Sequence, residues 1–353
     1  MGRRTALWTA AAVSLGLVAV RTLGAREADL RGEVALVTGG SRGLGLLLAR
    51  ELGRAGCRVA ICARDGAELE RARQRLEREG IETLALQCDV GDGNAVEAMV
   101  ADVGRRWGPV DLLINNASII QVGPVRTMSR RDFAEAMDVN YWGTVHPTLA
   151  VLPRMLERRR GRIVNVTSIG GKVAVPHLLP YTAAKHAVVG FSEGLAVELA
   201  REGIQVTTIV PGLMRTGSYL NAVFDGDRRA EFAWFSLGAT LPGVSMDAER
   251  AARQIVRAVR RGERERILSL PAALLARAHG VAPATTLAAL SAVNRLLPSA
   301  DGRRLGAARG RQVAADMHAP VLQAVTRLGR TAARRFHQFP SGEGGDAPVR
   351  EAS

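Results

Sequence analysis

Residues 33–56 read EVALVTGGSRGLGLLLARELGRAG, and this stretch decides the fold. Its first part is a short apolar run that ends in glycine, which is typical of a buried β-strand. Its second part repeats leucine at helical spacing and closes at Gly56, which is typical of an amphipathic helix. A glycine-rich turn, TGGSRGLG at residues 38–45, therefore joins the end of a strand to the start of a helix.

The alternation of strand and helix continues along the chain. Further strands are predicted at RVAICA, ETLALQCDV, VDLLINNA, GRIVNVTS, IQVTTIVPG and ERILSLP, with helical patterns between them. Residues 131–159 predict one long helix, bent near Pro147 or Pro153. Strands separated by helices form a parallel sheet that is covered on both faces. We therefore predict an α/β fold, a Rossmann-type doubly wound parallel sheet of about seven strands.

The pattern divides the chain into four segments. Residues 31–270 form the main domain, residues 271–298 an apolar helical extension, and residues 299–353 a Gly/Arg-rich, poorly ordered tail. Residues 1–30 form a hydrophobic segment that associates with a membrane. As a helix, its uncharged stretch from Thr5 to Val20 would be about 24 Å long, short of the roughly 30 Å of a bilayer core. A span, an interfacial helix and a signal segment stay open, with the main domain expected in the cytoplasm.

Composition excludes several classes of function. The formal net charge is +14, but the arginines are spread along the chain without interleaved aromatic residues, so no nucleic-acid partner is predicted. The three cysteines form no CxxC pair and lie in apolar contexts, which indicates buried, reduced thiols. The six histidines have no metal-ligand spacing, so no metal site is predicted.

The glycine-rich turn predicts a phosphate-binding site. Gly39, Gly43 and Gly45 let the backbone turn tightly and approach a phosphate, and the helix that follows offers unpaired N–H groups. The context of strand before and helix after indicates a dinucleotide. The second strand ends in ICARD, where NAD sites place an acid, and Arg64 and Arg42 could instead clamp a 2′-phosphate. We expect NADP(H) in preference to NAD(H), which stays open because Asp65 follows Arg64.

With these motifs in order, residues 31–270 resemble the short-chain dehydrogenase/reductase family. The similar motifs are TGGSRGLG, CDV (88–90), NNAS (115–118), MDVNYWG, IVNVTS, YTAAK and PGLMRT, and Ser118 departs from the family's NNAG. Across the whole chain the likeness is to membrane-associated bacterial members of undefined substrate. The resemblance implies cofactor binding by Gly39, Ser41, Arg42, Gly43, Leu44, Gly45, Arg64, Asp89, Val90, Asn116, Ala117, Tyr181, Lys185, Pro211, Gly212 and Thr216.

The resemblance also implies a catalytic set of Asn140, Ser168, Tyr181 and Lys185. Tyr181 and Lys185 are four residues apart, so a helix places them on one face, and an ammonium nearby would lower the pKa of the tyrosine. Ser168 would hydrogen-bond the substrate oxygen, and Asn140 would hold a water that connects Lys185 to solvent. Hydride transfer with Tyr181 as acid or base would then interconvert a carbonyl and an alcohol.

The substrate is predicted only by class. Aromatic residues gather after Gly212, and we expect Phe232 and Trp234, with Ser168 and Tyr181, to bind a lipophilic carbonyl such as a 3-oxoacyl, sphingoid, sterol or retinoid-like compound. The resemblance implies a homo-oligomer. A sugar-nucleotide epimerase or dehydratase and a non-catalytic dinucleotide-binding regulator stay open as alternatives.

Overall fold

The computed structural model describes residues 27–299, 306–317 and 326–338. Its main sheet has seven strands in the order β11-β7-β6-β4-β1-β2-β3, and every neighbouring pair is parallel. Their bounds are β1 Val34–Thr38, β2 Arg58–Ala63, β3 Thr83–Gln87, β4 Leu112–Asn115, β6 Gly161–Val166, β7 Ile204–Val210 and β11 Glu265–Ile267. The strand order reverses between β1 and β4, and this doubly wound arrangement confirms the predicted fold class.

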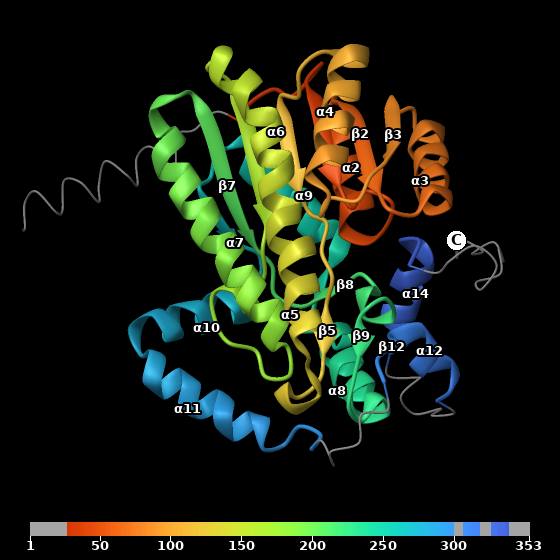
Figure 1. Ribbon diagram of the computed structural model, residues 1–353, viewed down its shortest axis with the longest axis vertical. Coiled ribbons are helices and arrows are strands. Elements are labelled where there is room, and N and C mark those ends of the chain that lie inside the picture. Colours follow the sequence, from red (N-terminus) through yellow and green to blue (C-terminus); the bar gives the residue numbers. More distant parts are fainter. Residues whose placement is uncertain (1–26, 300–305, 318–325, 339–353) are drawn as a thin grey trace, which may run out of the picture.

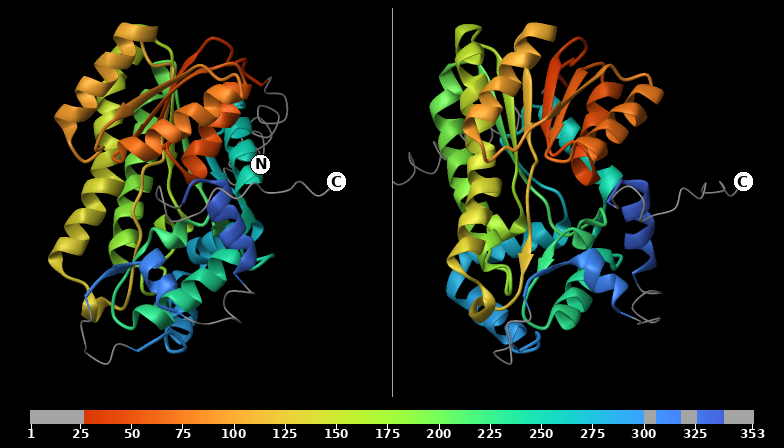
Figure 2. Two further views of the ribbon diagram at one scale, coloured as in Figure 1. Left: turned by 90° about the vertical axis from the view of Figure 1, so that its right-hand side faces the viewer. Right: turned by 45° about the vertical axis from the view of Figure 1, so that its right-hand side comes forward.

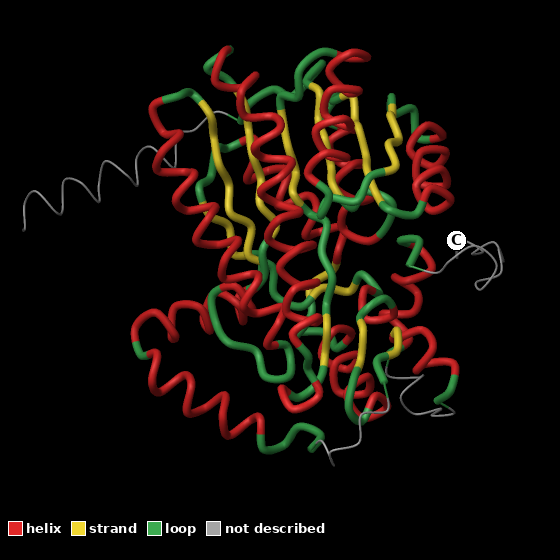
Figure 3. Tube along the Cα trace, in the orientation of Figure 1, coloured by secondary structure: helices red, strands yellow, loops and turns green. Residues whose placement is uncertain are grey.

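Helices cover both faces of the sheet and bury two apolar cores (Figure 3). One core packs α2 (Gly43–Arg54), α3 (Gly66–Arg78) and α9 (Ala248–Arg260) against the strands. The other packs α4 (Gly93–Trp107), α6 (Gly143–Glu157) and α7 (Leu179–Glu198) against the opposite face. Because both faces are covered, the central strands are apolar throughout rather than alternating.

The helix predicted over residues 131–159 is not continuous. It consists of α5 (Arg130–Ala136), a π-helical segment η2 (Met137–Trp142) and α6. The two prolines that were expected to bend it lie inside α6. Wider π-helical turns are frequent at functional sites, and here the segment contains the predicted catalytic residue Asn140.

A small lobe at the carboxyl ends of the strands is built mostly from residues after the sixth main strand, with one short strand added from the segment after β4. It contains α8 (Arg228–Thr240), a pair formed by β8 (Met214–Arg215) and β10 (Met246–Asp247), and a three-stranded sheet of order β12-β9-β5. The strands of the latter are β5 (Gln121–Val122), β9 (Val223–Phe224) and β12 (Ala308–Arg309). A third core, which includes Tyr181, joins this lobe to the main domain.

Within the predicted Gly/Arg-rich tail, the structure describes residues 306–317 and 326–338. β12, α12 (Gly310–Ala315) and α14 (Arg327–Arg335) are ordered elements, and α12 and α14 pack beside α8 (Figures 1 and 2). The apolar extension forms two helices, α10 (Leu270–Val281) and α11 (Pro283–Asn294). None of the described helices is long and apolar enough to cross a bilayer. The predicted membrane segment, up to residue 26, lies outside the described residues.

Candidate active site

The glycine-rich turn needs glycine for steric reasons. Gly39 has a φ of +65°, and a Cβ there would lie 2.9 Å from the Cα of Ala117. A Cβ on Gly45 would collide with the carbonyl oxygen of Gly39. Asn116 locks the turn to the end of β4, because its Nδ2 donates to the carbonyl of Thr38 at 3.0 Å. The close approach of the segment after β4 and of the turn's own backbone therefore leaves no room for a Cβ at Gly39 or Gly45.

The start of α2 has donors available for a phosphate. The N–H of Leu46 donates to the carbonyl of Arg42 at 3.3 Å, as in an ordinary first turn. The N–H of Gly43 donates to the carbonyl of Phe336 at 2.8 Å. Among the described residues, the N–H groups of Leu44 and Gly45 have no acceptor. These two groups and the helix dipole fit a phosphate of a dinucleotide.

An arginine pair lies beside the turn. Arg42 forms an ion pair with Glu68, with Nη1 and Oε1 2.9 Å apart. Burial lowers the pKa of Arg42, the Glu68 carboxylate opposes this, and the like charges of Arg309 and Arg64 lower it further. Arg64 is half-exposed, with Nη1 3.9 Å from Oδ2 of Asp89. A 2′-phosphate would relieve the mutual repulsion of these cations.

The acids around this cluster have structural tasks. Asp65, which left NAD(H) open at the sequence level, caps α3, since its Oδ1 accepts from the N–H of Glu68 at 2.9 Å. Oδ1 of Asp89 accepts from the N–H of Gly91 at 3.0 Å. Sequence reasoning missed Glu68, although an acid three residues after a capping aspartate is a recognisable signal for the first turn of a helix. One oxygen of Asp65 is therefore engaged in the helix cap.

Tyr181 and Lys185 lie on one face of α7, as their spacing predicts. Lys185 is only 2% exposed, its Nζ donates to the carbonyl of Val166 at 3.1 Å, and it lies 5.7 Å from the centroid of the Tyr181 ring. Burial lowers the pKa of Lys185 to about 8. An ammonium has three donors, and Val166 is its only acceptor among the described residues. The remaining donors fit the hydroxyls of a nucleotide ribose.

Ser168 lies next to the tyrosine at the end of β6. Its Oγ accepts from the N–H of Gly170 at 3.0 Å. Burial raises the pKa of Tyr181, and the hydrogen bond to Ser168 opposes the rise. The net direction is a rise of the Tyr181 pKa, opposite to the lowering that the spacing of Lys185 predicted, because burial is the largest influence. The two hydroxyls nonetheless converge where a carbonyl oxygen could accept from both.

Asn140 lies in the π-helical segment and is held by the loop after β4. It is fully buried, and its Oδ1 accepts from the hydroxyl of Ser118 at 2.6 Å and from the N–H of Ile119 at 3.1 Å. Its Nδ2 donates to the carbonyl of Ile119 at 3.3 Å. The side chain thus holds the loop after β4, and Ser118, which departs from the family motif, supplies one of its contacts.

The residues predicted to border the nicotinamide follow β7 and lie close to the segment of Ser168. The carbonyl of Pro211 accepts from the N–H of Ile169 at 2.7 Å. A Cβ on Gly212 would lie 2.6 Å from Oγ of Ser269, so the start of α10 closes this edge. Thr216 is buried, and its Oγ1 accepts from the N–H of Ser218 at 3.2 Å. The remaining predicted cofactor residues, Ser41, Val90 and Ala117, lie at the ends of β1, β3 and β4.

The two aromatic residues predicted to bind substrate differ in exposure. Phe232 is buried and packs against Tyr219 and Phe224. Trp234 is half-buried, and its Nε1 donates to Oε2 of Glu231 at 2.6 Å. Oε1 of Glu231 lies 2.7 Å from Nδ1 of His177, in the segment that precedes Tyr181. Sequence reasoning missed this Glu231–His177 contact, which connects α8 to the segment before α7.

Comparison with known proteins agrees with this geometry. A family model described as short chain dehydrogenase matches residues 33–223. A Streptomyces coelicolor protein assigned as a ketoacyl reductase is 44% identical over 186 residues, which cover 52% of this chain and 71% of that protein. The gluconate 5-dehydrogenase of Gluconobacter oxydans is 40% identical over 188 residues, covering 53% of this chain and 73% of its own length. The crystal structure of a variant actinorhodin polyketide ketoreductase with NADPH aligns with a TM-score of 0.59 at 35% identity, covering 67% of this chain and 95% of that one.

Proposed function

The chain belongs to the short-chain dehydrogenase family, and we propose that it is an NADPH-dependent reductase that interconverts a ketone or aldehyde and an alcohol. The observation that carries this proposal is the convergence of the Ser168 and Tyr181 hydroxyls beside the buried ammonium of Lys185. A non-catalytic dinucleotide sensor would not need these three groups together. Related proteins that act on CH–OH groups support the reaction class.

NADPH is proposed as the cofactor because the residues present fit it. The free N–H groups of Leu44 and Gly45 would bind a phosphate, and Lys185 would bind the nicotinamide ribose. Arg42 and Arg64 would hold the 2′-phosphate, which NADH lacks. When bound, NADPH supplies the hydride that reduces the carbonyl carbon. The ketoreductase with NADPH supports the same assignment.

The chain itself supplies the proton. Burial keeps Tyr181 protonated at neutral pH, so its hydroxyl can donate to the carbonyl oxygen as that oxygen gains negative charge. The Ser168 hydroxyl donates to the same oxygen and stabilises the charge. Lys185 is a positive charge next to the tyrosinate that would remain. Asn140 holds the loop after β4 and is proposed to position rather than to transfer a proton.

A lipophilic substrate and a membrane surface are supported by the apolar extension. Residues 270–298 contain no acidic residue. At the two ends of α10, Leu270 is 70% exposed and Val281 is 87% exposed. Such an apolar, acid-free surface suits a lipid environment at the cytoplasmic side. A homo-oligomer is likewise proposed, because Leu149 of α6 and Val197 of α7 expose apolar side chains on neighbouring helices.

NADPH oxidation with a panel of ketones of increasing chain length tests the function. Activity should rise with apolar chain length, and Tyr181→Phe should reduce turnover by about 10³-fold or more while NADPH still binds. Phenylalanine retains the packing of the ring, so a loss of activity reports the hydroxyl. Turnover by Tyr181→Phe at the wild-type rate would contradict the proposed mechanism.

A further inference from the structure

The C-terminal part of the chain packs against the glycine-rich turn. We name residues 327–338, which comprise α14 and the three residues after it, the C-terminal strap. The carbonyl of Phe336 accepts from the N–H of Gly43 at 2.8 Å, and the Phe336 ring is buried in the core that contains α2. A Cβ on Gly217 would collide with Ala333, so the strap also packs tightly on the loop after Thr216. It therefore touches both ends of the proposed cofactor site.

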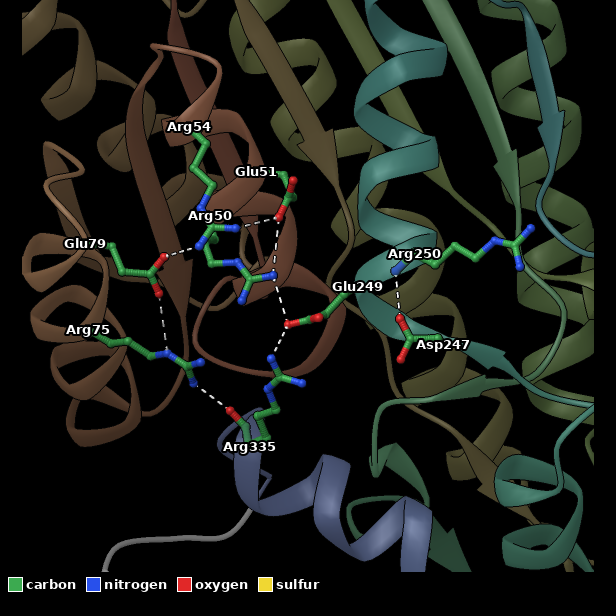
Figure 4. Close-up of polar contacts among 9 residues, drawn as sticks. All are labelled: Arg50, Glu51, Arg54, Arg75, Glu79, Asp247, Glu249, Arg250 and Arg335. Carbon is green, nitrogen blue, oxygen red and sulfur yellow. Dashed lines mark hydrogen bonds and ion pairs between the residues drawn. The ribbon is translucent and has the colours of Figure 1, made fainter. Parts of the chain in front are cut away.

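Ion pairs fasten the strap to the main domain (Figure 4). Nη2 of Arg335 lies 2.9 Å from Oε1 of Glu249 on α9, and the same Glu249 oxygen lies 3.1 Å from Nη2 of Arg50 on α2. Nη1 of Arg75 on α3 donates to the carbonyl of Arg335 at 2.5 Å. Three helices of the main domain thus fix the end of α14 beside the glycine-rich turn.

This arrangement places Gln338 beside the glycine-rich turn. Only 4% of it is exposed, and its Oε1 accepts from Nδ2 of Asn221 at 2.7 Å. Nδ2 of Asn221 also donates to the backbone carbonyl of Gln338 at 3.0 Å. The oxygen of the carboxamide is therefore held toward Asn221. The Nε2 end lies over Gly43, so closely that a Cβ on that glycine would collide with it.

The donors of Nε2 have no acceptor among the described residues. This amide nitrogen is not one of the fully buried, unpaired side-chain atoms of the described residues, so its donors remain accessible to a ligand. The unpaired N–H groups of Leu44 and Gly45 lie in the same helix start. Three donor groups without acceptors thus lie near the amino end of α2, and a dianionic diphosphate could supply acceptors for all three.

We propose that Gln338 is a cofactor-binding residue that donates its side-chain N–H to the pyrophosphate of the dinucleotide, with Asn221 and the C-terminal strap as its positioning elements. This inference rests on the proposed function. If the strap instead blocked the cofactor, the Phe336 carbonyl would compete with the phosphate for the N–H groups at the start of α2. That carbonyl takes the N–H of Gly43 alone and leaves Leu44 and Gly45 free, which favours a shared site.

The test is nucleotide binding to the full chain without ketone, followed by NADPH or NADH fluorescence. Gln338→Glu retains an oxygen for Asn221 but replaces the donor with a charged acceptor. It should weaken NADPH and NADH by the same factor, about 10- to 100-fold, because both carry the pyrophosphate. Gln205→Glu is the matched control, since it makes the same change at an exposed position near the amino end of β7, and it should bind like the wild type.

Binding within twofold of wild type, tighter binding, or a loss confined to NADPH would each overturn the proposal. A second variant, Asn221→Ala, should weaken both nucleotides by a smaller factor because it only frees the Gln338 side chain. The melting temperature without nucleotide separates binding from folding, since a purely structural role predicts a fall in melting temperature with no change in affinity for the folded fraction. Failure of the wild-type chain to bind either nucleotide would refute the proposed function and this inference together.

Discussion

Replacing Lys185 with methionine is expected to stabilise the nucleotide-free protein while removing its activity. Burial lowers the pKa of this lysine from 10.5 to about 8. A tenfold change in acidity corresponds to about 1.4 kcal/mol, so the buried charge costs the folded protein about 3 kcal/mol at pH 7. Methionine has a similar volume and no charge, but it leaves the Val166 carbonyl without the lysine donor, which costs about 1 kcal/mol. The net gain is about 2 kcal/mol.

The sign of the pH dependence follows from the direction of the pKa change. The folded pKa lies below the unfolded one, so the charge destabilises the folded state fully below about pH 8 and progressively less as pH rises toward 10.5. At pH 9.5 the cost is about 1.4 kcal/mol, which the lost hydrogen bond nearly offsets. Lys185→Met should therefore melt about 5 °C above wild type at pH 7 and at nearly the same temperature at pH 9.5.

Thermal unfolding without nucleotide, followed by circular dichroism at the two pH values, checks this expectation. Lys172 is the matched control, since it is the only other lysine in the sequence. Burial would lower the pKa of Lys172, but hydrogen bonds to Glu193 and Glu265 outweigh burial and raise it. Lys172→Met should thus give no stabilisation at pH 7. The reasoning fails if Lys185→Met is less stable than wild type at pH 7, or if its advantage does not shrink at pH 9.5.

Two further predictions concern the cofactor turn. The double variant Arg42→Ala/Arg64→Ala should weaken NADPH binding about 100-fold and NADH binding less than about threefold, because only NADPH has the 2′-phosphate. Fluorescence titration measures both affinities. Equal losses for the two nucleotides would contradict the cofactor assignment. Gly45→Ala should destabilise the fold by about 2 kcal/mol and abolish NADPH binding, because its Cβ would collide with the carbonyl of Gly39. Gly104→Ala, at an exposed position of α4 where a Cβ meets nothing within 4 Å, should instead stabilise by about 0.5 kcal/mol. Equal melting temperatures for the two alanine variants would refute the steric reasoning.

The features that the sequence predicted correctly are local. The strand, turn and helix around Gly43 follow from hydrophobic period and glycine spacing within about 25 residues, and repetition of this local pattern along the chain predicts the parallel sheet. The buried state of Cys57 and Cys62 likewise follows from their apolar neighbours, and burial raises the pKa of each thiol to about 12. In each case the residues that determine the feature are neighbours in the chain.

The features that were not predicted from the sequence depend on residues that are far apart in the chain. Asn221 and Gln338 are 117 positions apart, and nothing in the Gly/Arg-rich composition near the C-terminus indicates that this glutamine reaches the start of α2. Composition predicted disorder there because few apolar residues are present to form a core. The strap is ordered because Phe336 and Ala333 insert into cores that other segments already provide.

Tyr181 and Lys185 show what the spacing of two residues can predict and what it cannot. A separation of four residues on a helix makes Tyr181 and Lys185 neighbours, and this the structure has. This spacing does not determine which atoms of the two side chains face each other, nor how much water remains around them. With the ammonium over the ring and both side chains buried, desolvation outweighs attraction, so the pKa of the tyrosine rises and that of the lysine falls. Each group is thus displaced toward its neutral form, which is the state in which Tyr181 still holds the proton that a carbonyl reduction requires.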